Sequence, residues 1–342
     1  MRFPSSLSVQ QHVSLRALNT FGIDAQADLY LPIETATQLA ALRDDPVLSC
    51  MPRLVLGGGS NILLTADFHG IVLHSCSRGI GIVGEDADAV YLRAAGGESW
   101  QALVDWTLQR QIGGLENLSL IPGSVGAAPI QNIGAYGAEV ATTIDRLTVF
   151  DFDTGTCKIL DRTACAFGYR DSVFKQALRD RVMILDVTFK LPRRWQPNLR
   201  YAELADALVH FAAPTMQEVS AAVCAIRRRK LPDPAVIGNA GSFFKNPVVS
   251  REQRDRLLQQ YPALVSHDQS DGTAKLAAGW LIDQCGWKGR AMGPAGVHQQ
   301  QALVLINRGG AQGADILRLA EAIAADVWRR FAVALEPEPV YI

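Results

Sequence analysis

Three consecutive glycines follow a short apolar stretch near the first third of the chain. Residues 53–56 have the composition of a strand and lead directly into Gly57-Gly58-Gly59-Ser60-Asn61. Glycine permits positive φ and lets backbone N–H groups approach an anion closely, while the Ser and Asn add side-chain donors. No helix with apolar spacing and no Lys follows, which excludes a GxGxxG dinucleotide fingerprint and a P-loop. On spacing alone, the segment is a tight turn or an anion cradle.

A second glycine-rich segment spans residues 121–137. It holds four glycines and three alanines in 17 residues, with almost no charge and with Ile and Val in place of the usual polar loop residues. Small side chains over such a length bring backbone close to something flat or bulky. The segment is therefore either a binding surface for such a group or a tight loop that packs two domains together.

The elements that must position these segments are indicated by hydrophobic periodicity. The pattern predicts an α+β protein whose two halves meet near residues 195–215, after an irregular leader at residues 1–19. A strong helix over 215–230 ends in a basic run and is stopped by Pro232 and Pro234. The predicted strands are 53–56, 71–74, 90–94, 147–152, 182–191 and 302–307, the other helices 35–42, 100–109, 250–260, 274–285 and 314–331, and the last extended segment 334–342.

The overall composition excludes several classes of function. The 33 Lys and Arg residues balance 34 Asp and Glu residues, which argues against a nucleic-acid-binding surface. No apolar run is long enough for a signal peptide or a membrane span, so we expect a cytoplasmic protein without membrane insertion. The six cysteines lack CxxC spacing and a neighbouring His cluster, so we expect reduced, mostly buried thiols and no metal site. The sequence does not indicate a protein partner.

Taken together, the two glycine segments resemble the flavin-binding segments of the vanillyl-alcohol-oxidase-type FAD fold, and most closely those of the UDP-N-acetylenolpyruvoylglucosamine reductase family (the MurB family). The likeness continues, in the order of that family, through residues 168–175, 230–234, 238–247, 277–283 and 335–338, and covers roughly residues 18–342. Tyr201 resembles the tyrosine of the type I subtype, which carries an extra loop over the substrate. These motifs, taken together and in this order, are far more specific than any one of them.

The resemblance implies a domain plan. A two-lobed FAD-binding region of the vanillyl-alcohol-oxidase/PCMH type would span 18–195, with lobes of about 18–78 and 79–195. A smaller α+β substrate-binding domain would span 215–332, and a terminal segment 333–342 would follow. No His stands in the first glycine segment, where some relatives of the wider fold attach FAD covalently, so noncovalent FAD is implied. The residues implied to bind FAD are Gly57, Gly58, Gly59, Ser60, Asn61, Pro122, Gly123, Ser124, Gly126, Ala127, Gln131, Asn132, Gly134, Ala135 and Tyr136.

The implied reaction is the NADPH-dependent reduction, through FAD, of the enolpyruvyl group of UDP-N-acetylglucosamine enolpyruvate to UDP-N-acetylmuramate. This step belongs to peptidoglycan precursor synthesis, and so to cell-wall biogenesis, cell shape and cell division. Hydride reaches the terminal vinyl carbon, negative charge develops at the adjacent carbon, and one proton must be delivered there.

Three residues are implied to carry out the chemistry. Arg170 is always protonated and suits the developing charge, although the same residue outside this motif would be a salt-bridge partner of Asp171. Ser242 would be the proton donor, where an isolated Ser would be a turn or helix-cap hydroxyl. Glu338 must be protonated or bridged by water beside an enolate, and Glu336 is its rival, since strand alternation puts both on one face.

The diphosphate of the substrate needs cations and donors. Lys230 and Arg227 lie one turn apart at the basic end of the 215–230 helix, although cations there also suit the helix dipole without any ligand. Tyr201, Asn246 and Gln301 are further substrate-binding residues implied by the resemblance. Two other functions remain open: an oxidase on the same FAD fold, which leaves residues 241–244 and 335–338 unexplained, and a non-catalytic nucleotide-sugar-binding module, which would carry no yellow cofactor.

Overall fold

The computed structural model describes residues 7–342, and its contacts divide the chain into two compact units. Unit 1 comprises residues 26–59 and 68–227 together with the described residues up to Val13, and unit 2 comprises residues 14–25, 60–67 and 228–342. These units differ from the domain plan expected from the sequence. Two short N-terminal segments belong to unit 2, and the long helix before Lys230 belongs to unit 1 as far as Arg227.

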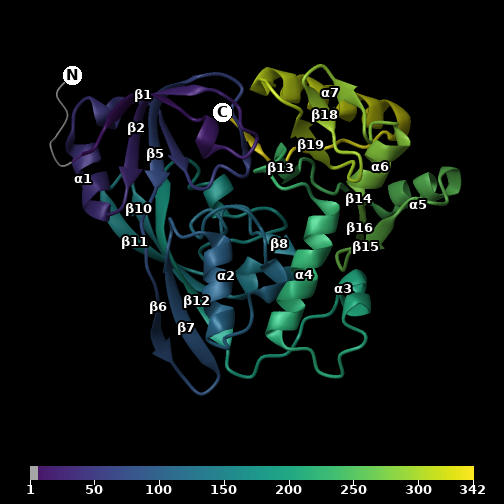
Figure 1. Ribbon diagram of the computed structural model, residues 1–342, viewed down its shortest axis with the longest axis horizontal. Helices are drawn as coiled ribbons and strands as arrows, with labels where there is room; N and C mark the ends of the chain where they lie inside the picture. Colours follow the sequence, from purple (N-terminus) through teal and green to yellow (C-terminus); the bar gives the residue numbers. More distant parts are fainter. Residues whose placement is uncertain (1–6) are drawn as a thin grey trace. The chain divides into compact units, whose positions relative to one another are not determined.

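The first lobe of unit 1 is a four-stranded sheet in the order β1-β2-β5-β3 (Figure 1). Strands β2 and β3 both run parallel to β5. Strand β2 alternates buried and partly exposed residues, and helix α1 covers the sheet with Leu39 and Leu42 after a capping box between Thr35 and Gln38. The bounds are β1 Gln10–Ser14, β2 Gln26–Ile33, α1 Ala36–Asp44, β3 Arg53–Leu56 and β5 Phe68–Ser75.

The second lobe of unit 1 is an antiparallel sheet in the order β11-β10-β12-β7-β6. Helix α2 begins after its N-cap Ser99 and buries Trp100, whose indole N–H donates to Leu118 O at 2.8 Å. Phe150, Phe152 and Met183 of this lobe join the apolar core of the first lobe, which ties the two lobes together. The bounds are β6 Ile80–Glu85, β7 Ala89–Ala95, α2 Trp100–Gln109, β10 Ile144–Asp151, β11 Thr156–Asp161 and β12 Val182–Pro192.

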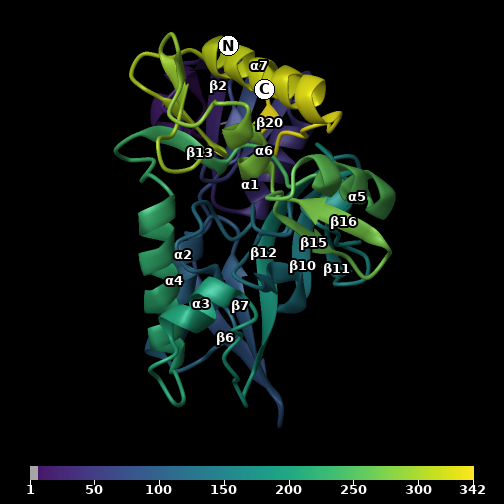
Figure 2. The same cartoon turned by 90° about the vertical axis from the view of Figure 1, so that its right-hand side faces the viewer.

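Helices α3, Ala202–Ala207, and α4, Met216–Lys230, complete unit 1. Helices α2 and α4 lie side by side in both views (Figures 1 and 2), and Gln217 Nε2 donates to Leu108 O at 3.0 Å. A small core of Leu204, Val219 and Val223 joins α3 to α4. Two short strands, β8 Gly134–Ala135 and β9 Ala138–Glu139, form a hairpin at the end of the second glycine-rich segment.

Unit 2 contains a four-stranded sheet in the order β13-β19-β18-β17, a three-stranded sheet in the order β14-β16-β15, and a parallel pair of β4 and β20. Helix α7 packs against β18 and β19, with α6 beside it (Figure 2). The bounds are β4 Ile62–Leu63, β13 Gly238–Ser242, β14 Val248–Ser250, α5 Arg251–Gln260, β15 Ser266–Asp268, β16 Thr273–Leu276, α6 Ala278–Gln284, β17 Ala291–Met292, β18 Ala295–Val297, β19 Val304–Asn307, α7 Gly313–Phe331 and β20 Val340–Tyr341.

The predicted α+β class is confirmed, and so is each of the predicted helices apart from its exact ends. Two expectations are wrong. The leader is not irregular throughout, because β1 and the turn Arg16–Leu18 lie in its described part. The helix predicted over 274–285 begins only at Ala278, because residues up to Leu276 form strand β16 and Ala277 keeps an extended backbone. The sequence pattern also did not predict strand β2 or most of the short strands of unit 2.

Candidate functional site

The two glycine-rich segments lie against each other within unit 1. An ideal Cβ on Gly57 would lie 2.4 Å from Ser124 Oγ, and one on Gly58 would lie 2.9 Å from Gly123 Cα. The second clash is with backbone, which cannot rotate away as a side chain can. Gly59 adds a left-handed φ of 59°. The glycines are therefore required by close backbone approach, which decides against the reading of an isolated tight turn.

Ser124 is the polar centre of this contact. Ser124 is buried, and its hydroxyl has no hydrogen-bond partner among residues 7–342. The surrounding backbone is held in place, since Trp100 N donates to Gly123 O at 3.0 Å and Gly126 N to Gly96 O at 2.8 Å. A buried hydroxyl without a partner costs about 1–3 kcal/mol. A rigid backbone cradle with an unsatisfied hydroxyl fits a phosphate-bearing cofactor.

The remaining predicted FAD residues lie along the same two segments. Ala127 Cβ is 3.3 Å from the Cβ position of Gly57, and Gly134 and Ala135 form β8. Gln131 is partly buried and Pro122 is exposed. Ser60 and Asn61 continue the first glycine run but belong to unit 2. The predicted cofactor residues are therefore divided between the units.

Asn132 acts inside the protein. Its side chain is buried, and its Nδ2 donates to Glu139 Oε2 at 2.9 Å and to Gly168 O at 3.0 Å, while its Oδ1 accepts from Ala141 N at 3.0 Å. Both N–H groups are used, so any contact with a cofactor would come from its backbone. The side chain instead ties the second glycine segment to the turn at 168–171.

Arg170 stands on that turn. Gly168 and Asp171 exchange backbone hydrogen bonds at 3.0 and 3.3 Å, which forces Arg170 to a left-handed φ of 54°. The Arg170 guanidinium donates to Gly134 O at 2.8 Å, and Lys175 Nζ donates to the Arg170 carbonyl at 3.0 Å. Strained backbone of this kind persists only where its surroundings over-determine it. The guanidinium is therefore held at the edge of the second glycine segment.

Tyr136, Tyr201 and Arg227 come together in the same unit. The Tyr136 and Tyr201 rings meet edge to face with centroids 5.1 Å apart. The Arg227 side chain hydrogen-bonds the Tyr136 side chain, and its Nε donates to Leu120 O at 3.2 Å. Burial lowers the pKa of the Arg227 guanidinium. Arg227 is thus not a solvated cation that only complements the helix dipole. Lys230 lies three residues further along α4, in unit 2.

In unit 2, backbone pairing joins Phe243, the residue after Ser242, to the end of the chain. Strand β13 ends at Ser242, opposite Val304 of β19, after a bulge at which Gly241 adopts φ 70°. Glu338 N donates to Phe243 O at 2.8 Å, and Asn61 Nδ2 donates to Glu338 O at 3.2 Å. Three segments far apart in sequence therefore bring Asn61, Phe243 and Glu338 into contact, and Ser242 directly precedes Phe243.

The same pairing separates the two candidate glutamates. Lys245 N donates to Glu336 O at 2.9 Å, and the Lys245 ammonium forms an ion pair with the Glu336 carboxylate. Glu336 is 69% exposed, whereas Glu338 is partly buried. Glu336 therefore faces solvent beside a cation, and the role of Glu338 that the resemblance implies stays a prediction. Lys245 is committed to Glu336 rather than to Ser242.

Asn246 and Gln301 make structural contacts. Asn246 Oδ1 accepts from Ala278 N at 3.0 Å, which caps helix α6 where Ala277 has no side chain to do so. Gln301 Oε1 accepts from Leu303 N at 3.3 Å and lies 3.3 Å from the Cβ position of Gly279. Only the amide nitrogens of these side chains are left for the substrate role that the resemblance implies.

Sequence reasoning missed the segment at 19–22. Thr20 O accepts from Asn239 N at 3.0 Å, Asn307 Nδ2 donates to Phe21 O at 2.9 Å, and Phe21 meets Phe243 edge to face. This segment therefore packs against β13 at Asn239 and against Phe243, the residue after Ser242. The Asn-Thr-Phe-Gly sequence predicts a turn. Its place in unit 2 is evident only from these tertiary contacts.

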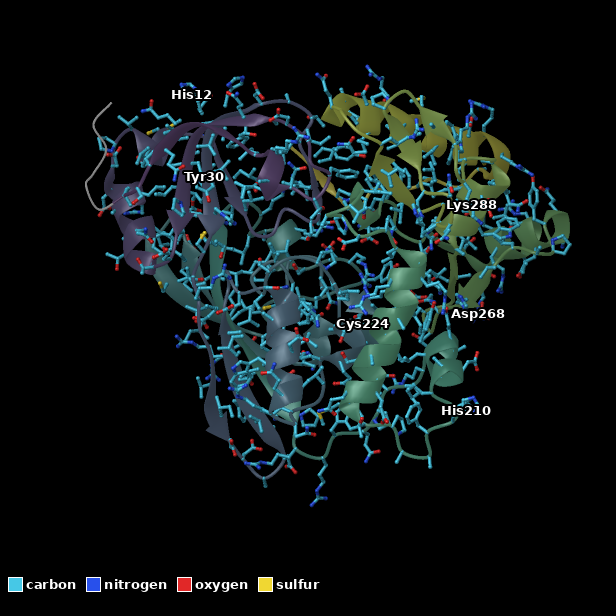
Figure 3. All side chains as sticks on the ribbon, viewed as in Figure 1. His12, Tyr30, His210, Cys224, Asp268 and Lys288 are labelled. Atoms are coloured by element: carbon cyan, nitrogen blue, oxygen red, sulfur yellow. The ribbon has the colours of Figure 1, made fainter. Side chains whose placement is uncertain are left out.

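Other nucleophilic and metal-binding groups of the described chain, residues 7–342, gather at one place without forming a metal cluster. In the first lobe (Figure 3), Tyr30 Oη is 2.7 Å from His74 Nδ1, and Cys76 Sγ is 3.4 Å from the same nitrogen. Burial lowers the pKa of His74 and raises that of Cys76, so the thiol stays protonated. All six cysteines are free, but only Cys165 is buried, so the expectation of mostly buried thiols is wrong. Residues 7–342 contain no cluster of three potential metal ligands.

Comparison with known proteins agrees with this geometry. The model of an FAD binding domain matches residues 28–161, and the model of the UDP-N-acetylenolpyruvoylglucosamine reductase C-terminal domain matches residues 233–342. A UDP-N-acetylenolpyruvoylglucosamine reductase from Paraburkholderia xenovorans is 56% identical over 330 residues, covering 95% of each chain. Another from Burkholderia ambifaria is 55% identical over 342 residues, covering 99% of this chain and 98% of that one.

A solved structure shares the fold. The crystal structure of UDP-N-acetylenolpyruvylglucosamine reductase from Thermus caldophilus has a TM-score of 0.70 at 23% identity and covers 98% of this chain and 99% of its own. None of the helices described at residues 7–342 is long and apolar enough to cross a membrane. The near-complete coverage at more than half identity places the chain in the UDP-N-acetylenolpyruvoylglucosamine reductase family.

Proposed function

We propose that this chain reduces the enolpyruvyl group of UDP-N-acetylglucosamine enolpyruvate to UDP-N-acetylmuramate, with FAD as cofactor and NADPH as hydride donor. Membership of the reductase family and the FAD-binding match support the reaction class. One observation carries the assignment within the fold: the Glu338–Phe243 backbone bond, with Asn61 bonded to Glu338, gathers the two motifs that an oxidase on this fold would leave unexplained.

The cofactor is held noncovalently by the glycine segments in this proposal. Gly57, Gly58 and Gly123 supply close backbone approach, and the Ser124 hydroxyl supplies the donor that has no partner within the protein. FAD supplies the capacity to take up hydride and to pass it on. Acid precipitation should release the flavin into the supernatant, and flavin that stays with the precipitate would contradict noncovalent binding.

Three side chains act on the substrate. Arg170 binds the substrate carboxylate and stabilises the negative charge that develops beside it. The Ser242 hydroxyl donates a proton to the carbon next to that carboxylate, and the strong basicity of the carbanion-like substrate makes up for the weak acidity of a hydroxyl. Glu338 donates a hydrogen bond in its protonated form or through an ordered water.

Cationic and amide side chains bind the nucleotide part of the substrate. Lys230 binds the diphosphate, assisted by the Nδ2 of Asn246 and the Nε2 of Gln301, whose oxygens are already engaged. Tyr201 is 37% exposed and covers the sugar nucleotide as part of a lid. Arg227, bonded to Leu120 and Tyr136, contributes a positive potential and holds the neighbouring segment in shape.

The proposed domain plan keeps residues 18–195 for FAD, residues 215–332 for substrate and residues 333–342 for Glu338. The reaction serves peptidoglycan precursor synthesis, and through it cell shape and cell division. We place the chain in the cytoplasm, because NADPH and nucleotide sugars are made there.

One measurement tests the proposal. NADPH oxidation by the purified yellow protein should be slow alone and fast with UDP-N-acetylglucosamine enolpyruvate. Rapid reoxidation of the flavin by oxygen, with no response to that substrate, would favour an oxidase. Substrate binding by a colourless protein that takes up no flavin would favour a binding module.

A further inference from the structure

Asn117 links two segments that are far apart in the sequence. Its side chain is buried, and its Nδ2 donates to Tyr136 O at 2.8 Å and to Asn198 O at 2.8 Å. Tyr136 lies at the end of the second glycine segment, residues 121–137, called here the cofactor loop. Asn198 lies in residues 195–201, called here the Tyr201 segment. One amide group therefore holds a carbonyl of each.

The Tyr201 segment has a separate anchor beside it. Trp195 Nε1 donates to Glu116 Oε1 at 2.8 Å, and the other oxygen of the same carboxylate accepts from Gly114 N at 2.5 Å. A Cβ on Gly113 would lie 2.2 Å from Trp195 Cδ1, so the absence of a side chain there makes room for the indole. The two hydrogen bonds of this anchor join Trp195, Glu116 and Gly114, all of which lie outside the cofactor loop.

Two further contacts join the cofactor loop directly to the Tyr201 segment. Asn198 Nδ2 donates to Gly137 O at 2.8 Å, and the Tyr136 and Tyr201 rings meet edge to face. Tyr136 keeps a left-handed φ of 48°, which is unfavourable for an aromatic residue and must be held by its surroundings. The bond from Asn117 to the Tyr136 carbonyl contributes directly to that restraint.

We propose that Asn117 is a positioning residue that couples the Tyr201 segment to the cofactor loop, so that the lid and the flavin-binding backbone hold their shapes together. The proposal rests on the proposed function, in which one segment covers the substrate and the other binds FAD. Two N–H donors on one planar group reach two carbonyls at once, which neither a hydroxyl nor a carboxylate can do. Among residues 7–342 the Asn117 Oδ1 has no hydrogen-bond partner, so the two donor contacts are the ones that orient the amide.

The matched comparison is Asn117→Ala against Trp195→Phe. The phenylalanine keeps an aromatic ring but removes the indole N–H, so it loosens the Tyr201 segment alone. Hydrogen exchange measured on the protein without flavin should rise in Asn117→Ala at both 134–141 and 195–205. In Trp195→Phe it should rise only at 195–205. Faster exchange at one segment only in Asn117→Ala would overturn the coupling.

The functional arm uses the flavin-loaded protein. Asn117→Ala should weaken FAD binding and raise the apparent KM for the enolpyruvyl substrate, each by ~5- to 10-fold, the usual cost of a lost buried hydrogen bond. Trp195→Phe should raise that KM and leave the FAD Kd unchanged. Unchanged FAD affinity in Asn117→Ala, together with a raised KM, would reduce Asn117 to a lid anchor and overturn the proposal.

Two further variants guard against simple misfolding. Asn117→Ser keeps one donor, so it should preserve one of the two contacts and give smaller changes in both exchange and affinity than Ala. Asn117→Asp has the same shape without N–H groups and should resemble Ala. If Asn117→Asp behaves as the parent, shape rather than donation matters and the proposal fails. Failure of the protein to bind flavin at all would instead refute the proposed function, and the exchange comparison would still stand.

Discussion

The backbone N–H of Glu338 donates to the carbonyl of Phe243 at 2.8 Å, which fixes Glu338 beside the residue that follows Ser242. The bond spans almost a hundred residues of sequence and lies within one compact unit. It brings a proposed proton donor and a proposed carboxyl group to one place, and the predictions on these two residues follow from it.

We expect Ser242→Ala to separate the two half-reactions. The variant should bind FAD and accept hydride from NADPH at near the parent rate, because the proton is needed only afterwards. Reoxidation of the reduced flavin by the enolpyruvyl substrate should slow by about 10²- to 10⁴-fold, the usual contribution of general acid catalysis. Ser242→Cys keeps a proton donor and should retain part of this rate. Rapid-mixing absorbance measures each step, and reoxidation of the alanine variant at the parent rate would end the assignment.

The two glutamates of the terminal segment form a matched pair. Glu336→Gln removes an exposed ion pair with Lys245 and should leave turnover nearly unchanged, since exposed ion pairs contribute at most about 1 kcal/mol. Glu338→Gln should slow the step in which substrate reoxidises the flavin and leave flavin reduction by NADPH intact. Steady-state and single-turnover rates of both variants decide the matter. The reverse ranking would make Glu336 the functional residue.

Glycine substitutions test the contact between the two glycine segments. Gly58→Ala places a Cβ 2.9 Å from Gly123 Cα, so the cofactor loop must move and FAD should bind at least ~10-fold more weakly. Gly81→Ala is the control, because a Cβ there meets nothing within 4 Å. Flavin fluorescence titration of the two apoproteins makes the comparison. Equal affinities would mean that the Gly58 contact does not shape the cofactor site.

Tyr201 is expected to act after the flavin is reduced. Its ring packs on Tyr136, so Tyr201→Phe should keep the segment in place while removing the hydroxyl. The apparent KM for the sugar nucleotide should rise by roughly 5-fold, as for one lost hydrogen bond, with flavin reduction by NADPH unaffected. Similar damage to both half-reactions would argue against a lid.

The Asp151–Lys158 pair should make stability depend on pH in acid. The hydrogen bond from Lys158, aided by the backbone N–H of Thr154, lowers the pKa of Asp151 to about 2. Because the pKa of Asp151 is lower in the folded state, its ionised form stabilises the folded protein at pH values above about 4, the pKa in the unfolded chain. That stabilisation is lost as the pH falls through about 2.

Asp151→Asn should therefore lower the free energy of unfolding by about 1–2 kcal/mol at pH 7, and the difference from the parent should shrink towards zero near pH 2. Asp153→Asn, which breaks an exposed pair with Arg181, should cost less at pH 7. Urea unfolding at several pH values measures both. A difference that stays constant from pH 7 to pH 2 would exclude the ionised Asp151 as its source.

Local sequence determined much of the secondary structure. Strand β3 and helix α2 have the predicted bounds, because each is a complete apolar pattern closed by its own turn or cap. The capping box of Thr35 and the N-cap Ser250 lie where their residue types indicate a helix start. The glycine runs and the terminal glutamate were recognisable as motifs for the same reason: their information lies in adjacent residues.

Tertiary structure alone decided which of these motifs meet. Glu336 and Glu338 alternate identically along the chain, and only the fold leaves Glu336 exposed in an ion pair with Lys245 while Glu338 is partly buried. Asn132, Asn117 and Arg227 are ordinary polar residues in sequence, and their roles depend on carbonyls that pairing at long range brings within reach. Hydrogen bonds between distant segments leave no periodic trace in either segment, because each donor needs only one acceptor that the fold places beside it.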